Sequence, residues 1–212
     1  ACGILMYHRV ADNVGGLNPP TWNVTPSQFR AQLSGLLSCG FQAWPLSKLL
    51  AAQRDSAEVS ANVFAVTFDD GHENNYSRAW PILEELGIPA TIFLATKHLD
   101  SNQPFPFDDW SAAGSPGVPS DSWRPLTTVQ CRAMLASGLI ELGAHTHSHE
   151  DFVGRGAEFR TDLDQCLSLL RQRFDIENPT FALPFGSSSE ELINLARRSG
   201  VSCCLSTRAR CV

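Results

Sequence analysis

Short apolar runs alternate with amphipathic stretches along the whole chain. The runs expected to form β-strands are Gly3 to His8, Phe41 to Leu46, Val63 to Asp70, Ala90 to Thr96, Leu139 to Thr146, Pro179 to Gly186 and Val201 to Thr207. Most are apolar on both faces, as parallel strands between a barrel interior and outer helices are. The alternation predicts parallel βα units and an α/β fold. Seven such runs favour a barrel over a small open sheet, although periodicity alone does not separate the two.

The amphipathic stretches carry recognisable helix ends. Thr25 is followed by Pro26 and Gln28, which makes a capping box, and this helix is expected to end near Gly40. The further expected helices are Asn75 to Leu86, Thr127 or Thr128 to Ser137, Ala157 to Phe174 and Ser188 to Ser199. A kink is expected at Pro81. These helix-end signals indicate how the chain folds and give no information about catalysis or binding.

The alternation fails between Leu99 and Leu126, a segment rich in Pro, Gly, Ser and Asp. A structureless segment of this length in a compact domain is usually functional or mobile. Its aromatic residues are Phe105, Phe107, Trp110 and Trp123. They either line a sugar-binding groove, because the apolar faces of pyranose rings stack on aromatic rings, or fix the loop to the body of the domain. Both interpretations stand.

Length and charge narrow the classes of function. A chain of 212 residues is long enough for one substantial core, and with no internal repeat or second boundary we expect residues 1–212 to form a single domain. The net charge of −6 and the lack of clustered Lys or Arg argue against nucleic-acid binding. No apolar run approaches the roughly 20 residues of a membrane span. The first residues do not resemble a basic and apolar leader, and because the sequence does not begin with Met the presence of a leader is left open.

The cysteines form no recognisable framework. There are seven of them, an odd number without CxxC spacing, so neither a disulfide scaffold nor a cysteine zinc site is indicated. We expect them to be reduced and mostly buried, which weakly favours a reducing compartment.

Two adjacent carboxylates close one apolar run, in "VTFDDGH" at 66–72. Asp69 and Asp70 fall at its carboxyl end, where parallel α/β folds build their active sites. Gly71 permits the backbone turn that would bring both side chains to one site. A surface turn is the alternative interpretation. Because two like charges this close need a cation or a proton to offset their repulsion, the pair favours a metal site.

A second cluster, "GAHTHSH" at 143–149, ends another run. His145 and His149 are four residues apart, so a helical turn after the strand would place both on one face, where neutral imidazoles can bind one ion. His147 would point elsewhere. One carboxylate and two imidazoles, with positions left for water, are typical of an open catalytic site for a divalent cation. Either cluster alone is weak evidence, but their coincidence at the ends of two buried strands indicates a metal site.

The remaining histidines are less informative. His8 ends the first strand and belongs to the same edge of the sheet, and His72 follows the Asp pair. For each of them a structural and a functional interpretation both stand. His98 is expected to be an ordinary loop residue.

At these residues the sequence resembles a known family. "TFDDG" at 67–71 is similar to the first motif of the polysaccharide deacetylases, also called NodB-homology or carbohydrate esterase family 4 enzymes, and "HTHSH" at 145–149 matches their second, H-[ST]-x-x-H. "ILMYHRV" near the start and "GLIELGAHTHSHEDF" extend the likeness over nearly the whole chain. The exopolysaccharide-modifying branch resembles it most, since it shares "FA-x-P-[FY]-G".

The resemblance implies a distorted (β/α)7 barrel that removes N-acetyl groups from sugar polymers. It also implies a divalent metal ion, zinc foremost, with cobalt or nickel as alternatives. By motif position Asp70, His145 and His149 would be the metal ligands and Asp69 the catalytic base.

The chain departs from the family pattern at two points. The third motif, Arg-x-Pro-Phe/Tyr, corresponds to residues 182–185, where Ala182 replaces the arginine that orients the base. Phe185 retains a role through its backbone N–H as an oxyanion donor. The late Leu-x-His motif is absent, because no histidine follows His149. The proton for the departing amine would then come from Asp69 or from His8, and either truncation or divergence at the C-terminus accounts for the difference.

Three functions follow as hypotheses. The first is metal-dependent N-deacetylation of an N-acetylated carbohydrate. The second is a metal-containing sugar-binding module without catalysis, and the third an amidase or esterase of this fold acting on another small acyl substrate. The resemblance favours the cell envelope or the exterior of the cell as the location, whereas the cysteines weakly favour a reducing compartment. The oligomeric state is left open.

Overall fold

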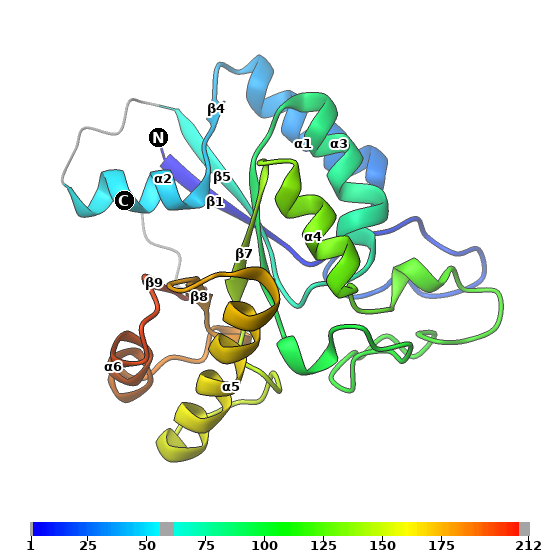
Figure 1. Ribbon diagram of the computed structural model, residues 1–212. Helices are drawn as coiled ribbons and strands as arrows, with labels where there is room; N and C mark the ends of the chain where they lie inside the picture. The colour runs from blue at the N-terminus through cyan, green and yellow to red at the C-terminus, as the bar shows by residue number, and fades with distance from the viewer. Residues whose placement is uncertain (1, 56–61, 208–212) are drawn as a thin grey trace.

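The computed structural model describes residues 2–55 and 62–207 (Figure 1). Its main sheet contains β1 (Cys2–Tyr7), β4 (Gln42–Ala43), β5 (Val63–Phe68), β6 (Ala90–Leu94), β7 (Ile140–Ala144), β8 (Thr180–Ala182) and β9 (Cys203–Leu205). The strands pair in parallel in the order β1-β5-β6-β7-β8-β9, and β4 also pairs with β5. Each of the predicted strands is therefore present, although several are shorter than predicted.

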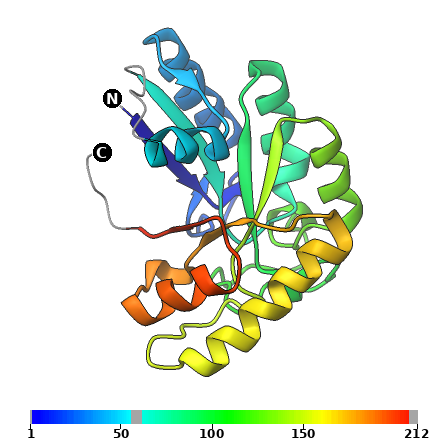
Figure 2. The same ribbon diagram turned by 60° about the vertical axis from the view of Figure 1, so that its left-hand side comes forward.

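The sheet curves into a barrel that does not close. β1 and β9 form its two edges, and within the described residues they do not pair with each other (Figures 1 and 2). This parallel α/β half-barrel confirms the predicted architecture and shows where the barrel is distorted.

The helices are α1 (Pro26–Ser38), α2 (Leu46–Arg54), α3 (Trp80–Leu86), α4 (Thr128–Ala136), α5 (Gly156–Phe174) and α6 (Glu190–Arg198). Figures 1 and 2 show α1, α3, α4 and α5 on the outer side of the curved sheet. The capping box at Thr25 forms as predicted, and Thr127 makes a second one with Gln130. Sequence reasoning missed α2, because it assigned Phe41 to Leu46 to one strand, whereas the chain turns at Pro45 and begins a helix.

The expected kink at Pro81 takes another form. Pro81 is the second residue of α3, and the preceding turn, η1 (Asn75–Ala79), is π-helical. Proline has no N–H to donate to the previous turn, so a wider turn can precede it without losing a further hydrogen bond.

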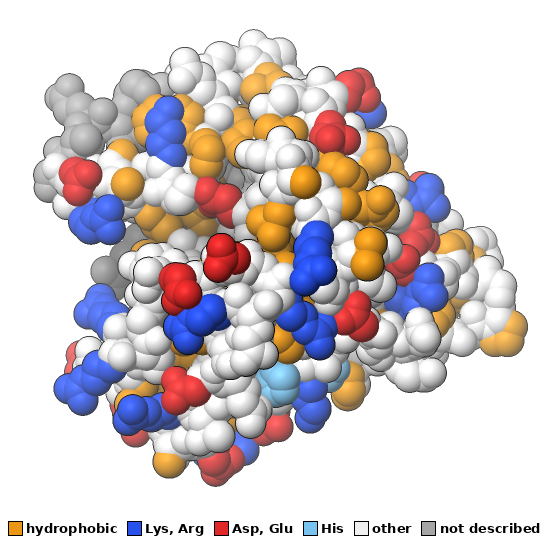
Figure 3. All heavy atoms as spheres, in the orientation of Figure 1, with side chains coloured by type: hydrophobic (Ala, Val, Ile, Leu, Met, Phe, Trp, Pro, Cys, Tyr) orange, Lys and Arg blue, Asp and Glu red, His pale blue; other side chains and the backbone are white. Residues whose placement is uncertain are grey.

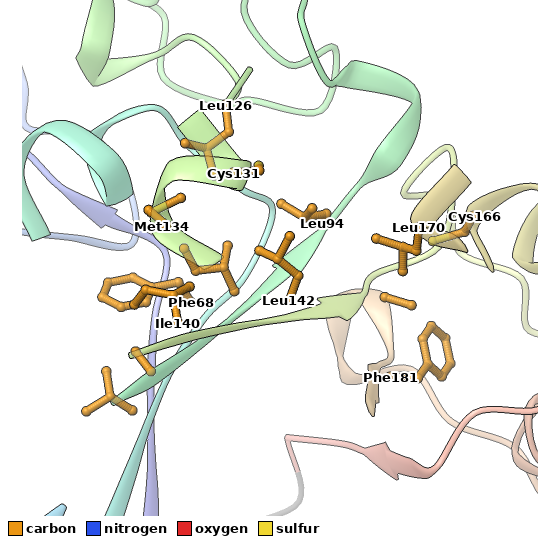
Figure 4. Close-up of a cluster of buried hydrophobic side chains, with 14 of the residues drawn as sticks. Phe68, Leu94, Leu126, Cys131, Met134, Ile140, Leu142, Cys166, Leu170 and Phe181 are labelled. Atoms are coloured by element: carbon orange, nitrogen blue, oxygen red, sulfur yellow. The ribbon is translucent and has the colours of Figure 1, made fainter. Parts of the chain in front are cut away.

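The core lies between the sheet and its outer helices. In Figure 4, Cys131 and Met134 of α4 lie close to Leu142 of β7, and Cys166 and Leu170 of α5 lie beside Phe181 of β8. Burial of these apolar side chains fixes both helices against the sheet. The carboxyl ends of the strands are thereby held in one arrangement at the edge of the sheet where the polar clusters lie.

Two long connections lie side by side at this edge. The first carries the short strands β2 (Arg9–Val10) and β3 (Asn23–Val24), and the second runs from 99 to 126 and includes the 3-10 turn η3 (Ser120–Ser122). The Trp110 indole donates to the carbonyl of Asn18 over 2.9 Å, and Asn74 joins Val10 to Asp121 through its side-chain amide. Figure 1 shows the two connections together. The 99–126 segment is thus held in place despite its lack of regular structure.

The surface charges agree with the expectation from composition, whereas the cysteines are less buried than expected, because only two of the six described ones are buried. Figure 3 shows basic and acidic side chains interspersed on the viewed face. Six cysteines in the described residues are free thiols, with Cys131 and Cys166 buried but Cys39 exposed, and Cys211 lies outside the described residues. None of the described helices is long and apolar enough to cross a membrane.

Candidate metal and catalytic site

A pocket of about 470 Å³ opens at the carboxyl ends of the strands. The six residues that the sequence analysis singled out all line it: His8, Asp69, Asp70, His145, His149 and Phe185. They come from four separate stretches of the chain. The sheet register brings these stretches together, because parallel strands end at the same edge.

The two carboxylates turn towards the pocket through a tight bend. Asp70 has a φ of 71° and Gly71 a φ of 87°, and the N–H of Gly71 donates to the carbonyl of Asp69 over 2.9 Å. A Cβ at residue 71 would lie 2.7 Å from a methyl carbon of Leu94, so only glycine fits there. The predicted turn is present.

Three side chains converge on one point in the pocket. Asp70 Oδ1 lies 3.1 Å from His149 Nε2 and 3.5 Å from His145 Nε2. Ligand atoms of these three residues all lie within 4.8 Å of one another. An oxygen and two imidazole nitrogens in this arrangement suit a divalent cation with open positions.

The histidine tautomer tests whether a cation fits. His145 Nδ1 lies 2.9 Å from the carbonyl of Ala182, and since a carbonyl only accepts, Nδ1 carries the proton. Burial lowers the pKa of His145 to about 4, so the ring is neutral and Nε2 presents a lone pair to Asp70. Asp70 Oδ1 is buried and accepts no hydrogen bond of good geometry. A cation between these lone pairs would satisfy all of them, and the residues therefore fit a metal ion.

The predicted helical turn between the two histidines is wrong. Residues 145–149 form a bend in which Thr146 and His149 have φ values of 64° and 61°. Thr146 Oγ1 accepts the N–H of His149 over 3.0 Å, and Asp162 accepts the N–H groups of residues 147 and 148. These bonds stabilise left-handed conformations that the sequence pattern could not indicate. His147 points away, as expected, and contacts Thr96 Oγ1 at 3.0 Å.

Aromatic rings hold the second histidine. The ring of Phe107 stacks on His149 with centroids 3.8 Å apart and planes inclined by 22°, and Phe185 contacts it edge-on at 4.8 Å. His149 Nδ1 is buried and has no hydrogen-bond partner. Packing therefore orients this ring, whereas a hydrogen bond orients His145.

Asp69 lies beside the triad without a cationic partner. The carboxyl is buried, and burial together with the charge of Asp70 raises the pKa of Asp69 to about 8. In the described part of the chain no lysine or arginine pairs with it. Arg9, the arginine of this pocket, is buried and forms an ion pair with Asp108. A cation bound at Asp70 would lower the pKa of Asp69.

His72 and the Arg9–Asp108 ion pair line the same pocket as the triad. His72 Nε2 lies 3.5 Å from Asp70 Oδ2, and its ring contacts Phe105 edge-on. Burial and the charge of Arg9 lower the pKa of His72 to about 4, so a neutral ring faces the second carboxylate oxygen. Of the two interpretations of His72, the geometry favours an orienting role. Sequence reasoning missed Arg9, although its place next to His8 in "MYHRV" was a signal.

His8 and Phe185 lie at the rim of the pocket. Burial lowers the pKa of His8, although the charge of Asp70 acts in the opposite direction. Phe185 is the second residue of the turn η4 (Pro184–Gly186), and the first N–H groups of a helical turn have no acceptor inside it. Both residues line the pocket, and their roles stay predictions.

The aromatic residues of the 99–126 segment divide between the two interpretations. Phe105 and Trp110 are buried and fix the loop, whereas Phe107 lines the pocket. His98 is not an ordinary loop residue, because its ring packs edge-on against Phe105 and Phe107. Sequence reasoning also missed Trp22, which stands at the rim of the pocket.

This geometry agrees with a comparison against protein families. The model of the polysaccharide deacetylase family matches residues 56–204, which is well over half of the chain. The chain belongs to the polysaccharide deacetylase family. The two motifs that line the pocket both fall within the matched range, so the resemblance seen in the sequence is confirmed.

Individual deacetylases extend the match. The poly-β-1,6-N-acetyl-D-glucosamine N-deacetylase of Staphylococcus aureus (strain MRSA252) is 23% identical over 189 residues, which cover 85% of this chain and 59% of the relative. IcaB from Ammonifex degensii superposes with a TM-score of 0.80 at 22% identity, covering 98% of this chain and 84% of IcaB. A de-N-acetylase from Aggregatibacter actinomycetemcomitans gives 0.78 at 18% identity, covering 97% and 87%. The chain spans about three fifths of the length of the curated relatives it matches.

The departure from the deacetylase pattern at Ala182 has a structural counterpart. The Ala182 carbonyl accepts from His145, so the backbone of this motif still supports the triad. Its side chain brings no positive charge to Asp69. Within the described residues nothing replaces the missing arginine as an ion-pair partner of Asp69.

The stack on His149 yields a prediction about metal affinity. Replacing Phe107 with alanine is expected to weaken zinc binding by about 10-fold, because orienting partners of metal ligands typically contribute about 10- to 100-fold. Phe107→Tyr keeps the ring and is expected to leave zinc affinity unchanged. Competition with a chromophoric chelator measures both. Equal affinity of the alanine variant and the original chain would show that the stack does not orient His149.

Proposed function

We propose that this chain removes N-acetyl groups from an N-acetylated sugar polymer in a reaction that depends on a divalent cation. The observation that carries the proposal is the convergence of Asp70, His145 and His149 beside the unpaired carboxyl of Asp69 in an open pocket. Membership of the deacetylase family supports it, as does the relative in S. aureus whose name specifies poly-β-1,6-N-acetyl-D-glucosamine.

The cation would be held by Asp70 Oδ1 and by the Nε2 atoms of His145 and His149. Zinc suits two imidazoles and one carboxylate with open coordination positions, and cobalt and nickel are the alternatives. When bound, such an ion contributes Lewis-acid chemistry, acidifying water and polarising an acyl carbonyl. His72 and the Ala182 carbonyl keep two of the ligands in place.

Asp69 acts as the general base. Within the described residues, no group donates a hydrogen bond to the carboxyl oxygens of Asp69. These oxygens can therefore accept the proton of an attacking water. Asp70 cannot share this role, because its charge is committed to the cation. Adjacent carboxylates thus take different roles through their surroundings.

The remaining steps use groups at the rim. The backbone N–H of Phe185 donates to the oxyanion that forms when water adds to the amide carbonyl. The departing amine needs a proton, which Asp69 returns or His8 donates. His8 lines the same pocket as Asp69, which places both within one site.

A second function has one observation in its favour. Asp69 lacks the arginine partner, and burial together with the charge of Asp70 raises its pKa to about 8. A carboxyl that stays protonated cannot act as a base, so a metal-containing sugar-binding module without catalysis is the rival to the enzyme.

Acetate release decides between the two. The full chain, stripped of metal with a chelator and then supplied with Zn²⁺ or Co²⁺, is incubated with N-acetylglucosamine oligomers. We expect no acetate without metal and steady release with it. Binding of the oligomers without release would support the sugar-binding module. Release of acetate from O-acetyl esters or small amides alone would assign the fold to the third hypothesis.

A further inference from the structure

Trp22 is the most exposed large aromatic side chain of the described residues. It is 71% exposed, and it lines the pocket that contains the triad. An indole this exposed buries little apolar surface and so contributes little to the stability of the fold. Its position at the mouth of the pocket points to a ligand.

The backbone at this residue is strained. Trp22 has a φ of 51°, which is rare for a bulky residue and unfavourable. The carbonyl of Trp22 accepts the N–H of Arg9 over 3.2 Å, and Asn23 exchanges two side-chain bonds with Ala11. These contacts hold the conformation, which keeps the indole at the rim.

One face of the Trp22 indole packs against another side chain. The ring stacks on His8 with centroids 5.4 Å apart and planes inclined by 23°. Because the side chain is still largely exposed, the opposite face is free to stack on a ligand. Polar groups adjoin it, since Thr21 donates to Asp109 and both residues line the pocket.

A second ring lies at the rim of the same pocket. Phe185 is 62% exposed and has a φ of 57°, and it comes from the connection after β8, far from Trp22 in sequence. Trp22 contacts His8, whereas Phe185 contacts His149. Two exposed rings in strained conformations thus border the same pocket.

We propose that Trp22 is a stacking platform for a pyranose ring next to the sugar whose acyl group enters the site. A pyranose presents C–H groups on its faces and hydroxyls at its edges, which matches an exposed indole bordered by Thr21 and Asp109. The pocket and the platform are continuous, so the ligand is one extended glycan rather than a separate partner. This inference rests on the proposed function.

The test compares substrates of different length. Trp22→Ala and Trp22→Phe are made in the full chain, with Val129→Ala as a matched control, because Val129 is 76% exposed on α4 and does not line the pocket. Acetate release is measured with zinc on N-acetylglucosamine and on its hexamer, in β-1,4 and β-1,6 linkage. Hexamer binding to the metal-free chain is measured separately by calorimetry.

For Trp22→Ala we expect KM for the hexamer to rise by about 2- to 10-fold, from the magnitude of aromatic pair contacts. The ratio of kcat/KM for hexamer to kcat/KM for monosaccharide should fall, and hexamer binding to the metal-free chain should weaken by a similar factor. Trp22→Phe should fall between, and Val129→Ala should match the original chain.

Other outcomes overturn the inference. A lower kcat on both substrates, with KM and hexamer binding unchanged, would mean that Trp22 acts only by positioning His8. If Trp22→Ala binds the hexamer as tightly as the original chain does, Trp22 is not a stacking platform. The proposed function is unaffected by that result. If the original chain releases acetate from neither substrate, the proposed function fails, and calorimetry still reports on the platform.

Discussion

Asp69→Asn is expected to lower kcat for acetate release by about 10²- to 10⁴-fold, the range that a general base contributes. The amide keeps the size of the carboxyl but cannot accept the proton of an attacking water. Asp69 is not part of the ligand triad, so zinc affinity should stay close to that of the original chain. Steady-state kinetics on the hexamer and a chelator competition measure the two effects.

A surface carboxylate provides the control for this variant. Asp164→Asn removes the same charge from α5, outside the pocket, and should leave kcat and zinc affinity unchanged. Near-normal turnover by Asp69→Asn would assign the base to another group. This test matters because the family's arginine is absent and no described cation pairs with Asp69.

His145→Ala is expected to abolish acetate release and to weaken zinc binding by more than about 100-fold, beyond the usual effect of an outer orienting partner. The variant removes one of three ligands and leaves the Ala182 carbonyl without its donor. Calorimetry on metal-free protein measures the affinity directly. Circular dichroism shows whether the variant is folded, so that loss of metal is not confused with loss of structure.

His147→Ala is the matched control within the same motif. His147 lies two residues away, faces Thr96 and is not part of the triad. Zinc affinity and turnover should both be retained. Equal zinc affinity in His145→Ala and in the original chain would show that the triad is not the metal site.

Much of the fold was accessible from the hydrophobic pattern. Apolar runs of six to eight residues located every strand of the main sheet, although β4, β8 and β9 are only two or three residues long. The signal is clearest for β5 and β6, which are buried on both faces and therefore largely apolar. The helix α2 was missed because Pro45 can either end a strand or begin a helix, and the local sequence does not distinguish the two. Whether the barrel closes could not be predicted, because closure depends on how β1 and β9 meet in space.

The candidate site was predicted in composition but not in geometry. "FDDGH" and "HTHSH" placed two carboxylates and two imidazoles at strand ends, and the parallel sheet brings strand ends together. The helical turn expected for the histidines was wrong, because Thr146 and Asp162 stabilise a bend through bonds to backbone N–H groups. Such bonds involve a residue on α5 that no local pattern connects to the motif.

The sequence by itself determined the α/β class, the family and the candidate residues of the site. These follow from periodicity and motif, which are local properties of the chain. Only the tertiary structure decided what surrounds the site. It stacked Phe107 on His149, paired Arg9 with Asp108 and left Trp22 open at the rim. These contacts join residues far apart in sequence through irregular segments, where neither periodicity nor spacing specifies which side chains meet.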